Sequence, residues 1–364
     1  GGDIGGPFTL VNGDGKTVTD KDVITKPTLL YFGYTFCPDV CPADNARNAE
    51  AVDILEERGF PADEVVALAS RRSQGTEVSY GDRTLKVKTL DQYDFSDTDI
   101  CLMSAGGNVS KEWSPKIAAQ GCLVIDNSSQ WRMDPDVPLV VPEVNPQAIA
   151  QYKARGIIAN PNCSTIQLVV ALKPLHDNYK IKRVVVSTYQ SVTGTGKAAV
   201  DQLFDERAGK EGAKVYPHKI DLNVLPHIDV FLENGYTKEE MKMLNEGRKI
   251  MDLPGLKVTT TCVRVPVFRA HSIAISAEFE KPVDIAAARK AITAFPGAEL
   301  CDDPANKKYP MPLDYAGKEK CGVGRLRKDT LFDNGISLWI SGDQLWKGAA
   351  LNAIQIAEVL LEGA

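Results

Sequence analysis

The sequence lacks the features of a membrane-spanning or nucleic-acid-binding protein. No apolar run approaches the ~20 residues that a spanning helix needs. Lysine and arginine do not gather into runs and the net charge is a modest -6, so there is no electrostatic reason to expect binding to nucleic acid or to an anionic membrane. Because the chain begins with Gly1 and not with methionine, a preceding signal or anchor stays open.

Histidine and closely spaced cysteine are also scarce. The chain has four histidines and eight cysteines, and only Cys37 and Cys41 lie close together. Widely spread cysteines in a chain with 43% apolar residues argue against a disulfide framework and favour a cytoplasmic protein. With 364 residues the chain is too long for one ordinary core and suits two domains.

A cysteine at a predicted helix start is the clearest sign of chemistry. Cys163 lies where an extended apolar run at 156–159 passes into a helical pattern at 168–175. The first N–H groups of a helix have no intrahelical partner and the macrodipole is positive there, so we expect a lowered pKa for the Cys163 thiol. Asn162 can cap the same turn. An inert buried cysteine is equally compatible with this local pattern.

Several segments together resemble the active-site and neighbouring motifs of the aspartate-semialdehyde dehydrogenases. They are PNCST at 161–165, STYQSVTG at 187–194, TKEEMK at 237–242, CVRVPV at 262–267 with His271 beyond, and KGAALN at 347–352. The resemblance runs in order from about residue 55 to the C-terminus. It implies NADPH-dependent reduction of L-aspartyl 4-phosphate to L-aspartate 4-semialdehyde and phosphate through a cysteine thioester, in the biosynthesis of lysine, methionine and threonine. It also implies a homodimer.

The resemblance implies roles for individual residues. Cys163 would be the nucleophile, His271 the acid/base group, and Gln190 would hold the intermediate. The substrate-binding residues would be Arg132 and Lys242 for the phosphate, Glu239 for the amine and Arg264 for the α-carboxylate. Glu239 and Lys242 are three residues apart on a predicted helix, where a plain surface ion pair would look the same.

NADP is the cofactor that the resemblance implies. Ser70, Arg72 and Ser73 follow a predicted strand at 65–69. Arginine and serine at this place suit a 2′-phosphate, whereas a carboxylate would select NAD. The other cofactor-binding candidates are Ser104, Gly106, Gly107, Thr193, Gly194 and Gln344. In the relatives that we expect, asparagine stands in the place of Gln344.

Alternating strands and helices predict an α/β fold with a doubly wound, mostly parallel Rossmann-like sheet and a second α+β catalytic and dimerisation domain. In the first domain, strands are expected at 65–69, 99–103 and 122–126, with a helix at 113–119. In the second, an antiparallel sheet is expected to include 183–190, 257–267 and 272–280. The expected divisions are an NADP-binding domain at 55–160, a catalytic and dimerisation domain at 161–342, and a C-terminal helix at 343–364 that returns to the first domain.

Residues 1–54 resemble a different family, the Sco/SenC copper chaperones. Their match includes YFGYTFCPDVCP at 31–42, with the C-x-x-x-C loop of that thioredoxin-like family. There, two cysteines and a distant histidine bind copper, and thiolates suit Cu(I). The first histidine here is His176, in the dehydrogenase-like part, so Cys37 and Cys41 are weak copper candidates and two idle cysteines are the favoured interpretation. No other metal site is expected.

The same segment stands where the dehydrogenases have a G-x-x-G-x-x-G turn for the cofactor pyrophosphate. It supplies a predicted strand at 28–34 and a predicted helix at 43–58, in the order that a β-α-β unit needs. The loop between them carries Pro38 and Pro42, which lack an N–H, and Asp39, which repels phosphate. We therefore expect weakened NADP binding.

Three other interpretations stay open. An N-acetyl-glutamyl-phosphate reductase uses the same thioester chemistry, but Glu239 argues against it, because a carboxylate gains nothing from an acylated amine. A copper-binding or thiol-redox module at Cys37 and Cys41 is the second. An inactive fusion of the two families is the third.

Overall fold

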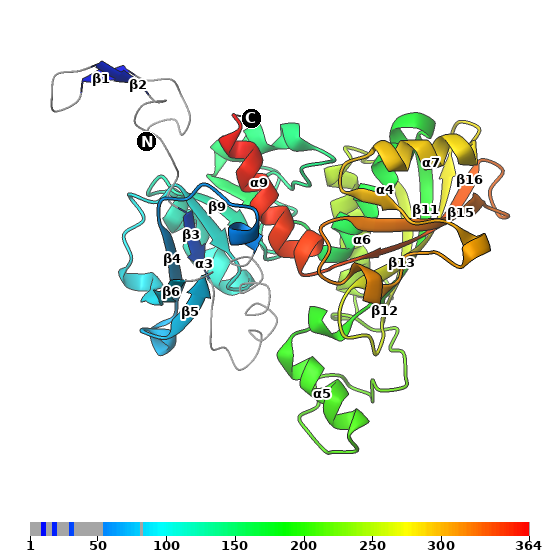
Figure 1. Cartoon of the computed structure of the whole chain (residues 1–364), viewed down its shortest axis with the longest axis horizontal. Helices are drawn as coiled ribbons and strands as arrows, with labels where there is room; N and C mark the ends of the chain where they lie inside the picture. The colour runs from blue at the N-terminus through cyan, green and yellow to red at the C-terminus, as the bar shows by residue number, and fades with distance from the viewer. Residues whose placement is uncertain (1–8, 12–16, 20–28, 33–53, 81–82, 364) are drawn as a thin grey trace. The chain divides into compact units, whose positions relative to one another are not determined.

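The computed structural model of the chain describes residues 9–11, 17–19, 29–32, 54–80 and 83–363 (Figure 1). The chain forms two compact units. The first is Gly1–Pro138, Gln147–Ala159 and Ala353–Ala364, and the second is Leu139–Pro146 and Asn160–Asn352. The domain limits expected from the sequence stay a prediction, and these units differ from them in two respects. Residues 139–146 belong to the second unit, and the chain re-enters the first at Ala353.

The first unit is built on a six-stranded sheet in which every pair of neighbours is parallel. Its strands, in spatial order, are β10 (Ile157–Ala159), β9 (Leu123–Asp126), β8 (Ile100–Met103), β3 (Leu29–Phe32), β4 (Val65–Ala69) and β7 (Lys88–Thr89). All residues of β4, β8 and β9 are buried, as is usual for parallel strands covered on both faces. The predicted doubly wound sheet is therefore confirmed.

Strand β3 comes from the segment that resembles the copper chaperones. It lies between β4 and β8, so the chain winds outward from it in both directions. This is the point of an open α/β sheet where the strand order reverses and where ligands bind beyond the carboxyl ends of the strands. The predicted strand is confirmed, whereas the helix expected at 43–58 is described only at its end, where residues 54–57 are helical.

The first unit contains several elements besides this sheet. They are the pair β1 (Thr9–Val11) and β2 (Thr17–Thr19), the hairpin of β5 (Glu77–Tyr80) and β6 (Arg83–Lys86), α3 (Gly107–Ala118), the 3-10 turns η1 (Arg71–Ser73), η2 (Leu90–Gln92) and η3 (Pro146–Ala154), and the C-terminal helix α9 (Leu351–Leu361). Arg58 forms a two-pronged ion pair with Glu358, with Nε–Oε1 at 2.6 Å and Nη2–Oε2 at 2.8 Å. This contact fixes the end of the first described helical turn to α9.

The second unit contains a mixed six-stranded sheet. Its spatial order is β12 (Lys257–Arg264), β11 (Ile181–Gln190), β13 (His271–Phe279), β16 (Gly335–Gly342), β15 (Cys321–Lys328) and β14 (Ala298–Leu300). β12 runs parallel to β11, so the expected antiparallel arrangement is wrong at this strand. The physical reason is the connection, which passes through α5 (Lys197–Arg207) and α6 (Lys238–Ile250) and is long enough for a crossover.

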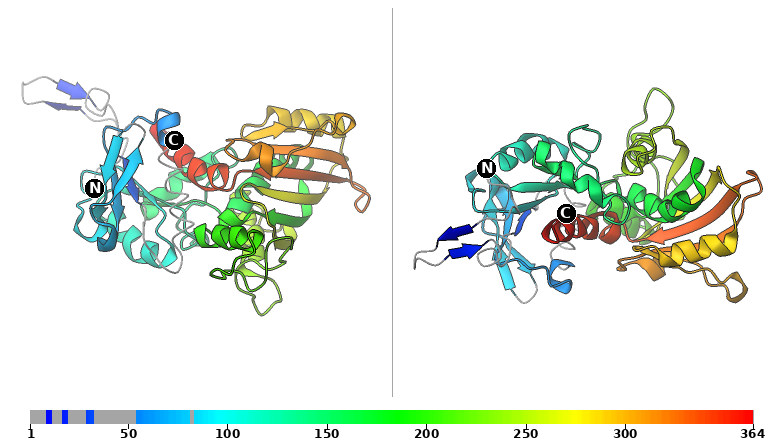
Figure 2. Two further views of the ribbon diagram at one scale, coloured as in Figure 1. Left: turned by 60° about the horizontal axis from the view of Figure 1, so that its bottom comes forward. Right: turned by 90° about the horizontal axis from the view of Figure 1, so that it is seen from above.

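Helices cover one face of this second sheet. α4 (Cys163–Tyr179) packs on β13 and β16, α6 on β12, and α7 (Ile285–Ala294) on β15 (Figure 2). Along β11, Val184 and Val186 are buried while Val185 and Tyr189 are exposed, so the other face lies open. Short turns complete the unit: η4 (Val192–Gly194), η5 (Pro304–Asn306), α8 (Pro312–Tyr315) and a π-helical turn, η6 (Trp346–Ala350). Within the described part of the chain, no helix combines the length and apolarity needed to cross a bilayer.

Candidate active site

Cys163 is the first residue of helix α4. Asn162 caps the helix, because its Oδ1 accepts hydrogen bonds from the N–H groups of Ser164 at 3.0 Å and Thr165 at 3.2 Å. The predicted helix start and cap are confirmed. The thiol is therefore attached where the helix dipole favours an anion, and this is the position from which a cysteine acts as a nucleophile.

Gly348, in the π-helical turn η6, lies directly against Cys163. A β-carbon added at Gly348 would come within 2.9 Å of Cys163 Cβ and 3.3 Å of Cys163 Cα. Only glycine allows this approach. The sequence motif included Gly348 without assigning it a role, and a glycine inside an apolar helical pattern was the signal that could have singled it out.

Four of the other described cysteines have the opposite environment, whereas Cys301 is half-buried like Cys163. Burial raises the pKa of the thiols of Cys101, Cys122 and Cys262, and it brings that of Cys321 to about 12. Cys163 is half-buried and stands at a helix start. A reagent or substrate that needs a thiolate is therefore directed to Cys163.

A buried carboxylate, Glu239, lies beside the helix cap. Its Oε1 accepts hydrogen bonds from Asn162 Nδ2 at 2.9 Å and Gln190 Nε2 at 3.2 Å, and its Oε2 from Lys242 Nζ at 2.8 Å. Burial opposes ionisation, but the charge of Lys242 and these donors outweigh it and lower the pKa of Glu239 to about 2. Because Glu239 is 5% exposed, this is not a surface ion pair.

Lys242 has a second acidic partner, Asp229, with its Nζ 3.0 Å from Asp229 Oδ2. Sequence reasoning missed Asp229. Its backbone has φ 68°, a left-handed conformation that residues in tight turns adopt, but no sequence motif marks it. The ammonium group thus lies between two carboxylates, which fixes its position.

His271 is fully buried at the start of β13. Its Nδ1 lies 3.1 Å from the backbone N of Ser191 and 3.1 Å from Ser191 Oγ. The backbone N–H can only donate, so Nδ1 accepts and a neutral ring carries its proton on Nε2. Gln190 Nε2 is 3.5 Å from His271 Nε2, so the two residues predicted to handle the intermediate lie side by side. Sequence reasoning did not assign a role to Ser191.

Arg264 ends β12 and is 5% exposed. Its Nη1 donates to the carbonyl oxygen of Ser191 at 2.7 Å, while its Nε is buried without a hydrogen-bond partner among the described residues. A β-carbon at Gly194 would come within 3.2 Å of both Arg264 Nη1 and His271 Cε1. A buried guanidinium with an unmet donor is suited to a substrate carboxylate.

Thr193 and Gln344 contact each other rather than standing apart. Gln344 Nε2 donates to Thr193 Oγ1 at 2.6 Å, and Gln344 Oε1 accepts from the N–H of Ala270 at 2.8 Å. Both ends of the Gln344 amide are thus used within the protein, and its side chain is fully buried. These contacts do not favour the cofactor contact expected for Gln344.

In the first unit, buried hydroxyls without partners mark the carboxyl edge of the parallel sheet. Ser70 follows β4 and Ser104 follows β8, and each Oγ is buried with no hydrogen-bond partner among the described residues. Gly106 has φ 84° and, with Gly107, begins α3 beside open space. Unmet hydroxyls and a glycine-bearing helix start at a switch point fit a dinucleotide.

The three residues expected at the adenosine ribose form the turn after β4. Ser73 is buried, and Arg72 is exposed. The neighbouring Arg71 pairs with Asp91, with Nε–Oδ2 at 2.6 Å. Arg72 therefore remains the better candidate for a 2′-phosphate.

Arg132, the predicted phosphate ligand, belongs to the first unit. It is 7% exposed, and its Nη2 donates to the carbonyl oxygen of Asn127 at 2.8 Å. Its charge acts on Asp126 at the end of β9, whose pKa is nevertheless raised, because burial outweighs the arginine and the serine donors.

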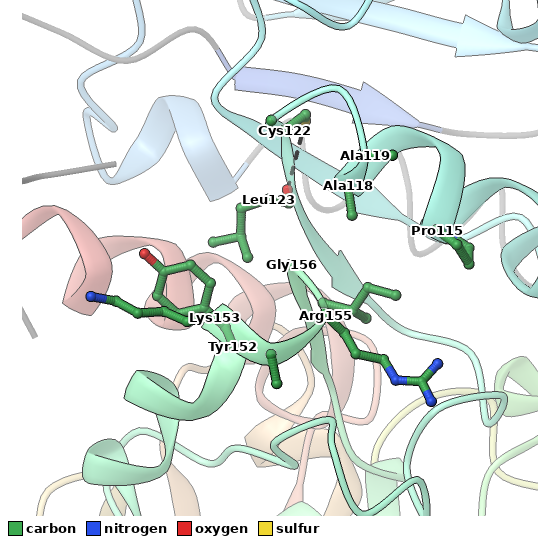
Figure 3. A pocket seen from close by; sticks show the side chains of 12 residues that line it. Pro115, Ala118, Ala119, Cys122, Leu123, Tyr152, Lys153, Arg155 and Gly156 are labelled. Atoms are coloured by element: carbon green, nitrogen blue, oxygen red, sulfur yellow. Dashed lines mark hydrogen bonds between the residues drawn. The ribbon is translucent and has the colours of Figure 1, made fainter. Parts of the chain in front are cut away.

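A pocket of about 570 Å³ opens at the other edge of the same sheet (Figure 3). Leu123 and Ile157, which begin β9 and β10, are among the residues that line it. Ligands of parallel sheets bind at the carboxyl ends of the strands, so this pocket is not where we expect the cofactor. In addition, Arg155 on its rim pairs with Asp134 at 3.3 Å.

No group of three metal-capable side chains occurs within the described ranges of the chain. The copper candidates Cys37 and Cys41, and the loop residues Pro38, Asp39 and Pro42, lie outside the described residues. The expectation of weakened cofactor binding that depends on this loop stays a prediction.

The fold and the site define a class: a dehydrogenase with a dinucleotide-type domain and a second domain that carries a nucleophilic cysteine. Family models agree, because residues 48–152 match the semialdehyde dehydrogenase NAD binding domain and residues 172–347 the semialdehyde dehydrogenase dimerisation domain. Residues 1–68 match SCO1/SenC.

Known proteins narrow the class. The chain is 54% identical to an aspartate-semialdehyde dehydrogenase of Aquifex aeolicus over 316 residues, which covers 85% of this chain and 93% of that one. It is 48% identical to the aspartate-semialdehyde dehydrogenase of Shewanella violacea, and the match covers 88% of this chain and 96% of that one. A crystal structure of aspartate semialdehyde dehydrogenase II from Vibrio cholerae superposes with a TM-score of 0.87 at 43% identity, covering 93% of this chain and 99% of that one. The chain belongs to the aspartate-semialdehyde dehydrogenase family.

Proposed function

We propose that the chain reduces L-aspartyl 4-phosphate with NADPH to L-aspartate 4-semialdehyde and phosphate. The observation that carries this proposal is the shared amide of Asn162, which caps the helix that begins at Cys163 and also binds the buried carboxylate of Glu239. One side chain thereby couples a nucleophile to a site for a substrate amine.

Cys163 performs the first step. Its sulfur attacks the acyl carbon of the substrate, a C–S bond forms, the C–O bond to phosphate breaks, and phosphate leaves with the electron pair. NADPH, when bound, supplies a hydride to the carbonyl carbon of the thioester. The sulfur then departs as the leaving group and the aldehyde is released.

His271 donates a hydrogen bond to the carbonyl oxygen of the substrate. With Nδ1 accepting from Ser191, the ring presents an Nε2–H donor. That donor stabilises the oxyanion as the tetrahedral species forms, and its proton stays on the ring when the carbonyl re-forms and the C–S bond breaks. Gln190, 3.5 Å from the same nitrogen, restricts where the oxygen lies.

Charged residues bind the rest of the substrate. The ionised Glu239 attracts the α-amine, and the unmet Nε of Arg264 receives the α-carboxylate. Lys242 is proposed to bind the phosphate, and the same role for Arg132 of the first unit rests on the resemblance alone. An N-acetylated substrate would bring no ammonium group to the ionised Glu239, which disfavours the N-acetyl-glutamyl-phosphate reductase alternative.

The residues of the first unit fit NADP. Ser70, Ser73 and Arg72 would hold the adenosine end with its 2′-phosphate, and Ser104, Gly106 and Gly107 the pyrophosphate side. Gly194 lies beside His271 and Arg264, and Thr193 and Gly194 would border the nicotinamide. Such NADPH-consuming biosynthesis with a reduced thiol is suited to the cytoplasm.

A homodimer through the second unit is part of the proposal. The open face of the second sheet exposes Val185 and Tyr189, and the Tyr189 ring lies 5.3 Å from that of Trp339. A groove of about 360 Å³ beside Trp339 continues this apolar surface. Light scattering of the intact chain tests the dimer, and a monomeric mass would contradict it.

The proposed reaction is tested by comparing the turnover of the parent protein with that of two cysteine variants. NADP reduction that needs both aspartate semialdehyde and phosphate is expected in the parent and is expected to vanish in Cys163→Ala. Cys301→Ala, which removes another half-buried thiol, is the control and should remain active. Activity in Cys163→Ala equal to the parent would refute the mechanism. A parent KM for NADP as low as that of its relatives would refute the expected effect of the replaced loop.

A further inference from the structure

Ala270, the residue before His271, has a left-handed backbone. Its φ is 70° and its side chain is fully buried. For a residue with a β-carbon this conformation costs free energy, and it persists only where the surroundings impose it. The direction in which the His271 side chain leaves the backbone depends on this conformation.

Gln344 imposes it. Its Oε1 accepts from the N–H of Ala270 at 2.8 Å, and its Nε2 donates to Thr193 Oγ1 at 2.6 Å. Thr193 Oγ1 in turn donates to the carbonyl oxygen of Phe268 at 2.6 Å. The amide thereby joins the turn before β13 to the η4 turn.

The same two turns meet at the imidazole. Ser191, just before η4, donates its N–H to His271 Nδ1 at 3.1 Å. The neighbouring Asp343 binds Arg269, with Nε–Oδ2 at 2.5 Å. Both residues that precede His271 are thus held by the consecutive side chains of Asp343 and Gln344.

We propose that Gln344 is a positioning residue for His271, which acts by holding Ala270 in its left-handed conformation. Both polar atoms of its amide make hydrogen bonds within the protein, and its side chain is fully buried. The role of His271 to which this inference refers rests on the proposed function.

A double-mutant cycle between Gln344 and Ala270 tests the inference. Gln344→Ala is expected to lower kcat about tenfold, a loss of about 1.4 kcal/mol of transition-state stabilisation, with the KM for NADP changed less than twofold. Glycine adopts a positive φ without strain, so in the Ala270→Gly background the same change should lower kcat less than about threefold.

Lys307→Gly is the matched control for this rescue. Lys307 is exposed, ends the remote turn η5 and also has a positive φ of 57°. The Lys307→Gly background should not reduce the loss of kcat that Gln344→Ala causes. Equal losses in the parent and Ala270→Gly backgrounds would overturn the inference, and so would a KM for NADP that rises tenfold with kcat unchanged.

A second measurement does not depend on turnover. The chain has four histidines, so a ¹³Cε1-histidine NMR spectrum contains four imidazole signals, and His271→Asn identifies that of His271. Gln344→Ala should shift this signal and Ala270→Gly should restore it. A signal that does not move in Gln344→Ala would overturn the inference even in an active enzyme. A parent without turnover whose signal does move would refute the proposed function alone.

Discussion

Asn162 and Glu239 are joined by a hydrogen bond of 2.9 Å between residues far apart in the sequence. The Nδ2 of Asn162 makes this bond while its Oδ1 caps helix α4 through Ser164 and Thr165. The backbone N–H of Asn162 also donates to Glu246 Oε2 at 2.7 Å, so helix α6 holds the cap from two positions. The orientation of Cys163 is therefore set by the helix that carries Glu239, the residue proposed to bind the substrate amine.

Replacing Asn162 should show whether its cap and its contact with Glu239 matter for catalysis as well as for the stability of the fold. Asn162→Ala removes the cap and one donor to Glu239, so we expect a loss of about 1 kcal/mol in the free energy of unfolding together with at least a tenfold lower kcat. Asp284→Ala is the control, because Asp284 caps α7 by accepting from the N–H of Ala287 at 2.7 Å. It should lose similar stability and keep its activity. Equal loss of kcat in both variants would contradict a role for Asn162 in the site.

Because Glu239 is ionised in the folded protein, we expect its protonation to cause part of the loss of folding stability at acidic pH. Its pKa is about 2 in the folded protein against a usual value of 4.5. A carboxylate whose pKa is lower in the folded than in the unfolded protein stabilises the fold at pH values above the unfolded pKa. This contribution is lost as the pH falls through the folded pKa. We expect a loss on the order of 3 kcal/mol between about pH 4.5 and pH 2.

Unfolding free energies measured across that pH range check this expectation. Glu239→Gln should have a flatter acid limb than the parent. Asp94→Asn should follow the parent closely, because Asp94 is exposed and its lowered pKa comes from hydrogen bonds with Ser96. A Glu239→Gln variant that loses stability as steeply as the parent below pH 4.5 would show that the carboxylate is not held ionised.

Local features of this chain were predictable because a few neighbouring residues determine them. The bounds of β4, the start of α4 at Cys163 and the strand β3 in the replaced segment follow from apolar runs and a capping asparagine. The direction of β12 was not predictable from its own sequence, since the connection through α5 and α6 determines it.

Features that depend on tertiary contacts were beyond the sequence. The spacing of Glu239 and Lys242 fits a surface pair as well as a buried one, and only the packing of α6 against α4 decides between them. The same holds for Asp229 and Ser191, which reach Lys242 and His271 from other segments. Resemblance supplied the residues of the site, but it did not supply these partners.

Cofactor choice should depend on Arg72. If this exposed arginine binds the 2′-phosphate, Arg72→Ala should raise the KM for NADP about tenfold and leave the KM for NAD nearly unchanged. Arg71→Ala is the neighbouring control, since Arg71 pairs with Asp91 and should affect both cofactors little. Steady-state kinetics with each cofactor gives the ratio. An unchanged NADP preference in Arg72→Ala would assign the phosphate to another residue.

The close approach of Gly348 to Cys163 predicts that one added methyl group is damaging there. In Gly348→Ala the new β-carbon would lie 2.9 Å from Cys163 Cβ, a distance that forces the first turn of α4 or the π-helical turn η6 to move. We expect at least a tenfold lower kcat and a changed rate of Cys163 alkylation by iodoacetamide.

Gly247→Ala is the matched control for this change. Gly247 lies inside helix α6 with no atom within 4 Å of an added β-carbon, so alanine should fit and stabilise the helix by about 0.5–1 kcal/mol. Its kcat should equal that of the parent. If Gly348→Ala kept both its kcat and its alkylation rate, the turn at η6 would have to yield without moving the sulfur, and Gly348 would have no part in placing the nucleophile.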